Sequence, residues 1–117
     1  VNVASVVGLK GVAYMSGYGA AKAGLINFSK TTAVEAAPHV RVNCIIPGAV
    51  LTPATQRAIP DKELMQRTIQ TIPLKRIAKP IELAHPIIFF LSSASSFITG
   101  ASLVVDGGKT GDLNAGN

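Results

Sequence analysis

Three short apolar runs along the chain predict β-strands, at residues 1–5, 40–46 and 101–105. A helical pattern separates each run from the next, so we expect the strands to run parallel in one sheet. The carboxyl ends of parallel strands lie at the same edge of a sheet, and open α/β sheets bind their ligands there. The pattern therefore predicts an α/β fold with its functional groups at that edge.

Two longer stretches carry the start and stop signals of helices. The first spans residues 16–37, with Ser16 as its expected N-cap, and ends before Pro38. The second spans about 80–93 and begins with a proline, which suits the first position of a helix. Its buried side is expected to consist of Ile81, Leu83, Ala84, Ile87, Ile88 and Leu91. Pro86 removes a backbone hydrogen bond within this helix, so we expect a kink there.

The remaining segments are rich in glycine, proline and polar residues. Residues 6–15 form a glycine-containing loop that we expect to lie over the ligand site, and residues 52–73 hold a short helix that Asp61 can cap. The stretch 110–117 is polar and predicts a disordered tail. The folded domain is therefore expected to span 1–109.

Composition and charge exclude several classes of function. The 117 residues carry a formal net charge of +5, but the basic residues are scattered and only Lys75 and Arg76 are adjacent, which argues against nucleic-acid binding. No apolar run is long enough to cross a membrane. Cys44 is a single cysteine, so we expect a reducing compartment such as the cytoplasm. His39, His85 and Cys44 lack the spacing of metal ligands, so no metal site is expected.

Candidate chemistry begins with Tyr18 and Lys22, which stand four residues apart at the start of the first predicted helix. This spacing puts both side chains on one helix face. A positive charge beside a phenol favours the phenolate, so the pair could transfer a proton near neutral pH. Ser5 lies at the end of the first predicted strand and brings a hydroxyl to the same sheet edge. Tyr14 is a second phenol, but it precedes Lys22 by eight residues and is interpreted as a loop residue or a substrate contact.

Taken together, the motifs resemble the C-terminal half of the short-chain dehydrogenase/reductase family. The stretches that carry the resemblance, in the order of the family, are Asn2–Gly8, Tyr18–Gly24, Val40–Gly48, Thr99–Gly100 and Val105–Gly108. The resemblance implies the C-terminal half of a Rossmann-like, doubly wound parallel sheet. It also implies about as much chain again upstream, with the glycine-rich phosphate-binding turn and the residue that chooses between NAD and NADP.

The resemblance implies a role for each of the three candidate catalytic residues. Tyr18 is the general acid for reduction and the base for oxidation. Lys22 supports the phenolate and binds the ribose hydroxyls of the cofactor, so Tyr18 and Lys22 both belong to the cofactor site. Ser5 donates a hydrogen bond to the substrate oxygen.

A second set of implied cofactor-binding residues follows the second strand. Pro47 and Gly48 resemble the family segment that faces the nicotinamide ring, where the backbone at Val50 and the hydroxyl of Thr52 hold the carboxamide. A Pro-Gly pair after a strand is otherwise only a turn. The implied cofactor is NAD or NADP.

The predicted function is hydride transfer between NAD(P) and a small carbonyl or alcohol substrate. The sequence resembles three groups of the family about equally: reductases of 3-oxoacyl chains, sugar-alcohol dehydrogenases and steroid dehydrogenases. The family also implies a homodimer or homotetramer in the full-length form, with the helix at 16–37 packed against its symmetry mate. The alternative prediction is a truncated, catalytically inactive fragment that acts at most as an assembly or interaction module.

Overall fold

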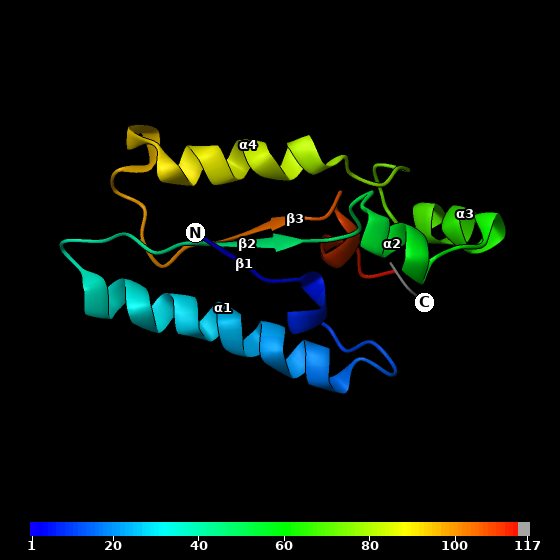
Figure 1. Ribbon diagram of the computed structural model, residues 1–117, viewed down its shortest axis with the longest axis horizontal. Coiled ribbons are helices and arrows are strands. Elements are labelled where there is room, and N and C mark those ends of the chain that lie inside the picture. The colour runs from blue at the N-terminus through cyan, green and yellow to red at the C-terminus, as the bar shows by residue number, and fades with distance from the viewer. Residues whose placement is uncertain (115–117) are drawn as a thin grey trace.

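Three short parallel strands form the centre of the computed structural model, which describes residues 1–114 (Figure 1). The strands are β1 (Asn2–Val3), β2 (Cys44–Pro47) and β3 (Ser102–Val105), in the order β1-β2-β3. Asn2 pairs with Cys44, and Cys44 pairs in turn with Ser102. The predicted parallel α/β sheet is confirmed, with β2 as its central strand.

The strands are shorter than the apolar runs predicted. The stretch before β2 does not pair as a strand, because the loop before β3 binds it in another way. Asn43 donates from its amide to the Ile98 carbonyl and accepts from the Ala101 N–H, at 3.0 Å each. The Val42 N–H donates to the Thr99 hydroxyl, and the Gly100 N–H donates to the Val42 carbonyl. The side chains of Asn43 and Thr99 therefore make most of the hydrogen bonds that a longer β2–β3 ladder would make, and the Gly100–Val42 bond joins the two backbones directly.

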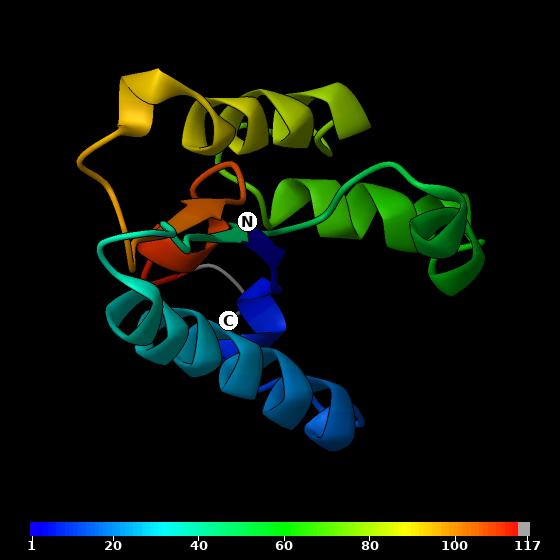
Figure 2. The ribbon, with the colours of Figure 1, turned by 60° about the vertical axis from the view of Figure 1, so that its left-hand side comes forward.

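Helices cover the two faces of the sheet. Helix α1 (Ser16–Ala36) lies on one face and helix α4 (Pro80–Leu91) on the other, and the two views agree on this three-layer order (Figures 1 and 2). Ser16 is not the N-cap of α1. The first helical hydrogen bond runs from the Gly19 N–H to the Met15 carbonyl, which puts Met15 at the cap position without a side-chain bond. Helix α4 continues through Pro86 to its end at Leu91.

Two helices, not one, occupy the segment after β2. Helix α2 (Pro53–Ala58) begins after Thr52, whose hydroxyl accepts a hydrogen bond from the Thr55 N–H at 3.2 Å. Helix α3 (Lys62–Gln70) is capped by Asp61, as predicted. The Asp61 carboxylate accepts hydrogen bonds from the N–H groups of Glu63 and Leu64. Helix α2, which has less than two turns, was not predicted from the sequence. Both helices project beyond the carboxyl end of β2 (Figure 1).

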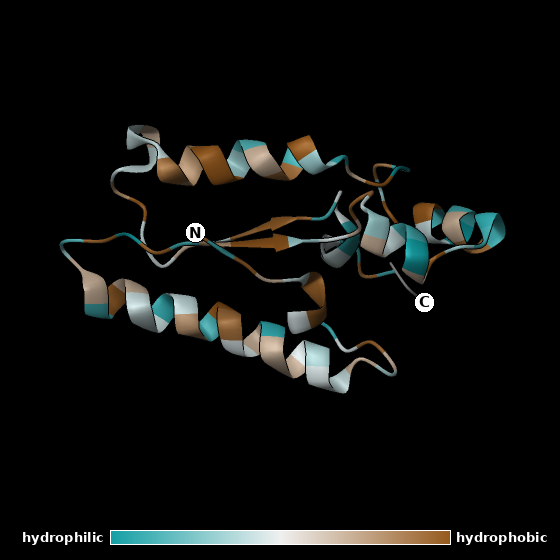
Figure 3. Ribbon diagram, viewed as in Figure 1, coloured by the Kyte–Doolittle hydropathy of each residue, from teal (hydrophilic) through white to brown (hydrophobic). Residues whose placement is uncertain are grey.

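The core forms on both sides of β2, because successive side chains of a strand point to opposite faces. Cys44 and Ile46 pack with Ile26 of α1, and Ile45 packs with Leu83 and Phe90 of α4. Cys44 is fully buried and serves as a small apolar core residue. Strands β2 and β3 are coloured mainly as apolar in Figure 3.

The predicted buried side of α4 was partly wrong. Leu83 and Phe90 are buried, whereas Ile81, Ile88 and Leu91 are 55%, 60% and 67% exposed. Helix α4 is apolar around most of its circumference, so its periodicity does not identify the face that meets the sheet.

Arg41 joins the end of α4 to the loop before β3. Its guanidinium donates to the carbonyls of Phe90 and Ser92 at 2.9 and 3.3 Å, and to the Ser95 hydroxyl and the Ile98 carbonyl at 3.0 and 3.1 Å. A cation at the C-terminal end of a helix also interacts favourably with the helix dipole.

The ends of β2 and β3 approach each other closely at Gly48. A Cβ atom at Gly48 would lie 2.7 Å from the Asp106 Cβ and 2.9 Å from its Cα. Asp106 in turn accepts hydrogen bonds from Gly108 and Thr110. Burial opposes the charged form of Asp106, but these hydrogen bonds outweigh it and lower its pKa. Gly48 thus has a structural function in addition to the predicted one.

The stretch 110–117, expected to be a tail, begins inside a 3-10 turn at Lys109–Gly111. Its last residues, 115–117, lie outside the described residues. Among the helices of residues 1–114, none has both the length and the apolar character needed to cross a bilayer.

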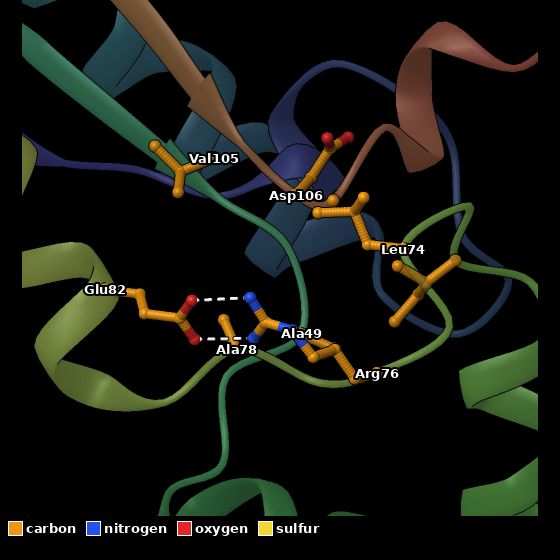
Figure 4. Close-up of a pocket in the computed structure, with 9 residues that line it drawn as sticks. Ala49, Leu74, Arg76, Ala78, Glu82, Val105 and Asp106 are labelled. Carbon is orange, nitrogen blue, oxygen red and sulfur yellow. Dashed lines mark hydrogen bonds and ion pairs between the residues drawn. The ribbon is translucent and has the colours of Figure 1, made fainter.

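An ion pair locks the turn that leads into α4. The Arg76 guanidinium meets the Glu82 carboxylate through two hydrogen bonds of 2.6 and 2.7 Å, and Glu82 also accepts from the Lys79 N–H at 2.8 Å (Figure 4). The hydrogen bonds from Arg76 and from the Lys79 backbone lower the pKa of Glu82 from 4.5 to about 2.

We expect Gly48→Ala to destabilise the protein by about 1–3 kcal/mol, the usual effect of overpacking, because the Asp106 backbone cannot move away without breaking the β2–β3 pairing. Gly11→Ala is the matched control, since a Cβ there meets nothing within 4 Å. Urea denaturation measures the free energy of unfolding of both variants. Equal stabilities for the two variants would contradict the close approach described above.

We expect the native state to lose stability as the pH falls from about 4.5 towards 2, because Glu82 is ionised in the folded protein and protonated in the unfolded chain over this range. Glu82→Gln removes this dependence, so its urea midpoint at pH 6 is lower than that of the wild type and the difference shrinks at pH 2.5. A difference that grows on acidification would show that the pair does not stabilise the fold through the ionised carboxylate.

Candidate active site

Ser5 lies just beyond β1, directly after the buried residue Ala4. It caps the 3-10 turn η1 (Val6–Gly8), and its hydroxyl oxygen accepts a hydrogen bond from the Val7 N–H at 3.2 Å. A hydroxyl offers one donor and two acceptor positions, so this bond leaves the proton of Ser5 available. The Ser5 side chain is therefore oriented by the backbone while it keeps a donor for a ligand oxygen.

The η1 turn lies directly against helix α1 because two glycines remove the side chains between them. A Cβ at Gly8 would lie 2.8 Å from the Ala23 backbone nitrogen and 2.8 Å from the Lys22 carbonyl carbon. A Cβ at Gly19 would lie 3.2 Å from the Val7 carbonyl oxygen. This close contact places the turn that begins at Ser5 on the first half of α1.

Lys22 connects β1 to Tyr18. Its Nζ donates to the Val3 carbonyl at 3.1 Å and lies 5.7 Å from the centroid of the Tyr18 ring. This distance is within the range of a cation–π contact. One of the three ammonium donors is used by Val3, so others remain for a ligand. Tyr18 is 46% exposed, and its hydroxyl makes no hydrogen bond within residues 1–114.

Tyr14 lies on the loop before α1 and does not share this arrangement. Its side chain is fully exposed and its backbone is left-handed, with φ of 66°. The structure thus brings Tyr18 and Lys22 together and seats the Ser5 turn on the same helix. The catalytic roles of the three residues stay predictions.

The segment after β2 holds the second set of predicted residues. Gly48 donates its N–H to the Val105 carbonyl, which extends the β2–β3 pairing beyond Pro47. Val50 forms a parallel bridge with Ala78, in which the Ala78 N–H donates to Ala49 and the Ala78 carbonyl accepts from Leu51. In extended backbone, neighbouring residues direct their N–H and C=O groups to opposite edges. The N–H and C=O of Val50 therefore face away from Ala78 and are available to a ligand.

Thr52 is already engaged within the protein. Its hydroxyl accepts from the Thr55 N–H and also lies 3.2 Å from the Thr55 hydroxyl, where either oxygen could donate. Thr52 thus caps helix α2 in addition to its predicted role at the carboxamide. That role stays a prediction.

Two pockets lie beside these residues without including them. One, of about 410 Å³, is lined by the loop after Val7 and by small residues of α1, including Gly19 and Ala23. The other, of about 80 Å³, lies between the end of β3 and the Arg76–Glu82 pair (Figure 4). Within residues 1–114, no three or more His, Cys, Asp or Glu side chains are placed to hold a metal ion.

The sequence analysis missed two partners of the predicted residues. The Val3 carbonyl holds Lys22 from a separation of 19 residues, and Ala78 pairs beside Val50 from the segment before α4. Both partners act through their backbone groups, so their side chains carry no signal in the sequence.

Known proteins with similar sequences match this chain over nearly its whole length. A family model described as enoyl-(acyl carrier protein) reductase matches residues 1–110. The chain is 43% identical over 109 residues to 3-oxoacyl-[acyl-carrier-protein] reductase of Thermotoga maritima, and 42% identical over 110 residues to acetoacetyl-CoA reductase of Shinella zoogloeoides. These alignments cover 92% and 93% of the chain but 44% and 45% of the two relatives.

Solved structures give the same result. A 4-hydroxyisoleucine dehydrogenase mutant complexed with NADH and succinate superposes with a TM-score of 0.91 at 34% identity, over 97% of this chain and 47% of that one. A short-chain dehydrogenase/reductase from Brucella melitensis superposes with a TM-score of 0.86 at 37% identity, over 92% of this chain and 43% of that one. The chain therefore spans less than half the length of the relatives it matches. From its fold, its ordered motifs and these similarities, the chain belongs to the short-chain dehydrogenase/reductase family.

Proposed function

We propose that this chain supplies the proton-transfer and nicotinamide-side residues of an oxidoreductase that moves a hydride between NAD(P) and a small carbonyl or alcohol substrate. The observation that carries the proposal is the position of Lys22, whose ammonium lies beside the Tyr18 ring and is held there by a strand carbonyl. The relative complexed with NADH supports a nicotinamide cofactor. The reductases among the relatives support a carbonyl substrate.

The residues present fit a nicotinamide cofactor. The N–H and C=O of Val50 form a donor–acceptor pair that suits a carboxamide, which itself has one acceptor and two donor hydrogens. Lys22 keeps donors for hydroxyl groups. When bound, the cofactor supplies the hydride, and the protein positions the reactants and manages the proton.

Each catalytic side chain has a defined task in this proposal. Ser5 donates its free proton to the substrate oxygen, where it stabilises the negative charge that develops during reduction. Tyr18 gives its proton to that oxygen in reduction and takes it back in oxidation. Lys22 provides the positive charge that stabilises the phenolate left on Tyr18.

We also propose that helix α1 pairs with a second copy of the chain. Phe28 and Val34 are 57% and 79% exposed on this helix, and Ala20 and Ala21 near its start leave room for close packing. An exposed apolar surface of this kind is typical of an interface.

Replacing Tyr18 by Phe is expected to lower kcat by at least about 100-fold, because the general acid is lost while the ring remains. The dissociation constant for NAD(P)H, measured by fluorescence titration, is expected to change little. Tyr14→Phe is the matched control and retains turnover, since its phenol stands apart from Lys22. Turnover by Tyr18→Phe close to that of the wild type would refute the proton-transfer role.

The alternative, an inactive assembly or interaction module, is tested on the same material. NAD(P)H oxidation is followed with a panel of ketones and 3-oxoacyl thioesters, after intact mass has confirmed the purified chain. Turnover that depends on Tyr18 supports the oxidoreductase. Folded protein that oxidises no NAD(P)H with any of them supports the module.

A further inference from the structure

We propose that Arg76 and Glu82 are positioning residues for the nicotinamide side of the site, which they hold through the backbone of Ala78. This inference rests on the proposed function, since it concerns how Val50 is presented to the cofactor. Neither residue touches the predicted catalytic groups. Their effect passes from the ion pair to the Ala78 backbone and from there to Val50.

The first step is the rigidity of the turn between Arg76 and α4. Two parallel hydrogen bonds join Arg76 to Glu82, at 2.6 and 2.7 Å, and the same carboxylate accepts from the Lys79 N–H at 2.8 Å. A bidentate pair fixes orientation as well as distance. Ala78 lies between these anchors, with Arg76 on one side and Lys79 on the other.

The second step is the link from Ala78 to the segment after β2. The Ala78 carbonyl accepts from the Leu51 N–H at 2.8 Å, and its N–H donates to the Ala49 carbonyl at 3.2 Å. The bridge is isolated, so no longer ladder holds Val50 in place. Val50 and Ala78 each pack against the core cluster of Ile45, Leu83 and Phe90. The direction of the free Val50 backbone groups therefore depends on where Ala78 lies.

The Arg76–Glu82 pair also lines a pocket beside the paired segments (Figure 4). Arg76 and Glu82 form one wall of a space of about 80 Å³, with Ala49 and Ala78 lining it from the two paired segments. Val50 and Ala78 contact the core cluster, but at the pocket Ala49 and Ala78 lack the close packing that would otherwise oppose a shift of their backbones. Next to a void, the paired backbones can shift when the ion pair is lost, and the Val50 groups shift with them.

A second ion pair in the chain gives a matched control. Arg67 and Glu63 meet at 2.6 Å on helix α3, and both are more than 70% exposed. This pair joins residues one helical turn apart, and no hydrogen bond within residues 1–114 links it to residues 49–51 or to Ala78. Exposed pairs of this kind contribute little to stability.

The test compares Arg76→Met, Arg76→Lys and Arg67→Met by hydrogen exchange at Leu51 and by NADH and NADPH affinity. We expect Arg76→Met to speed exchange of the Leu51 amide and to raise the dissociation constant about tenfold, which corresponds to about 1.4 kcal/mol. Arg76→Lys keeps the positive charge but cannot make the two parallel hydrogen bonds. We expect its exchange rate and its dissociation constant to lie between those of the wild type and Arg76→Met. Arg67→Met matches the wild type in both measurements.

The outcomes separate this inference from the proposed function. If the wild type binds NADH or NADPH and Arg76→Met binds it equally well, the inference is wrong while the proposed function stands. If the wild type binds neither, both are wrong. A general loss of stability would speed exchange at buried amides such as Ile45 as much as at Leu51, and this pattern would also overturn the inference. If Arg76→Met does not fold, the same two measurements on Arg76→Lys and Glu82→Gln are compared with those on the wild type.

Discussion

The close seating of the η1 turn on helix α1 is the contact on which the candidate site depends. Ser5 is on the strand side of this contact, and Tyr18 and Lys22 are on the helix side. Gly8 makes the contact possible, because any larger residue would meet the backbone of Lys22 and Ala23 at 2.8 Å. The hydrogen bond from Lys22 to the β1 backbone holds the two sides together. A local backbone requirement thus brings together groups that are 13 to 17 residues apart in the sequence.

The sheet gives this contact a firm base. Its central strand is buried on both faces, and the three strands end at one edge. The three ends differ in what they do. After β1 the chain presents the Ser5 hydroxyl, after β2 it presents the backbone of Val50, and after β3 the Asp106 carboxylate stabilises the turn that follows. The chemistry that we propose therefore uses the first two strand ends, and the third strand end contacts the second at Gly48.

Much of this arrangement could be predicted from the sequence, because it depends on local patterns. The i, i+4 spacing predicted that Tyr18 and Lys22 share a face, and Asp61 was recognised as a cap from its position. The buried face of α4 could not be predicted, since its residues are apolar on nearly every side. Arg41 was also missed. Its four acceptors lie 49 to 57 residues away, and such partners leave no periodic signal.

The extent of the strands was overestimated for a related reason. An apolar run shows that a segment is buried and extended, but it does not show whether backbone or side chains bind its polar groups. Before β2, the amide of Asn43 takes hydrogen bonds that a longer ladder would have made. The bridge between Val50 and Ala78 could not be predicted either, because only backbone atoms make it and no side chain signals it.

We propose above all that the Tyr18 phenol, the Lys22 ammonium and the Val50 backbone lie around the nicotinamide end of one bound cofactor. NMR chemical-shift mapping during titration with NADPH or NADH tests it most directly. We expect the resonances of the Tyr18 ring, the Lys22 Nζ and the Val50 amide to shift together, with one dissociation constant for all three. Shifts confined to other parts of the chain, or different dissociation constants for the three groups, would contradict it.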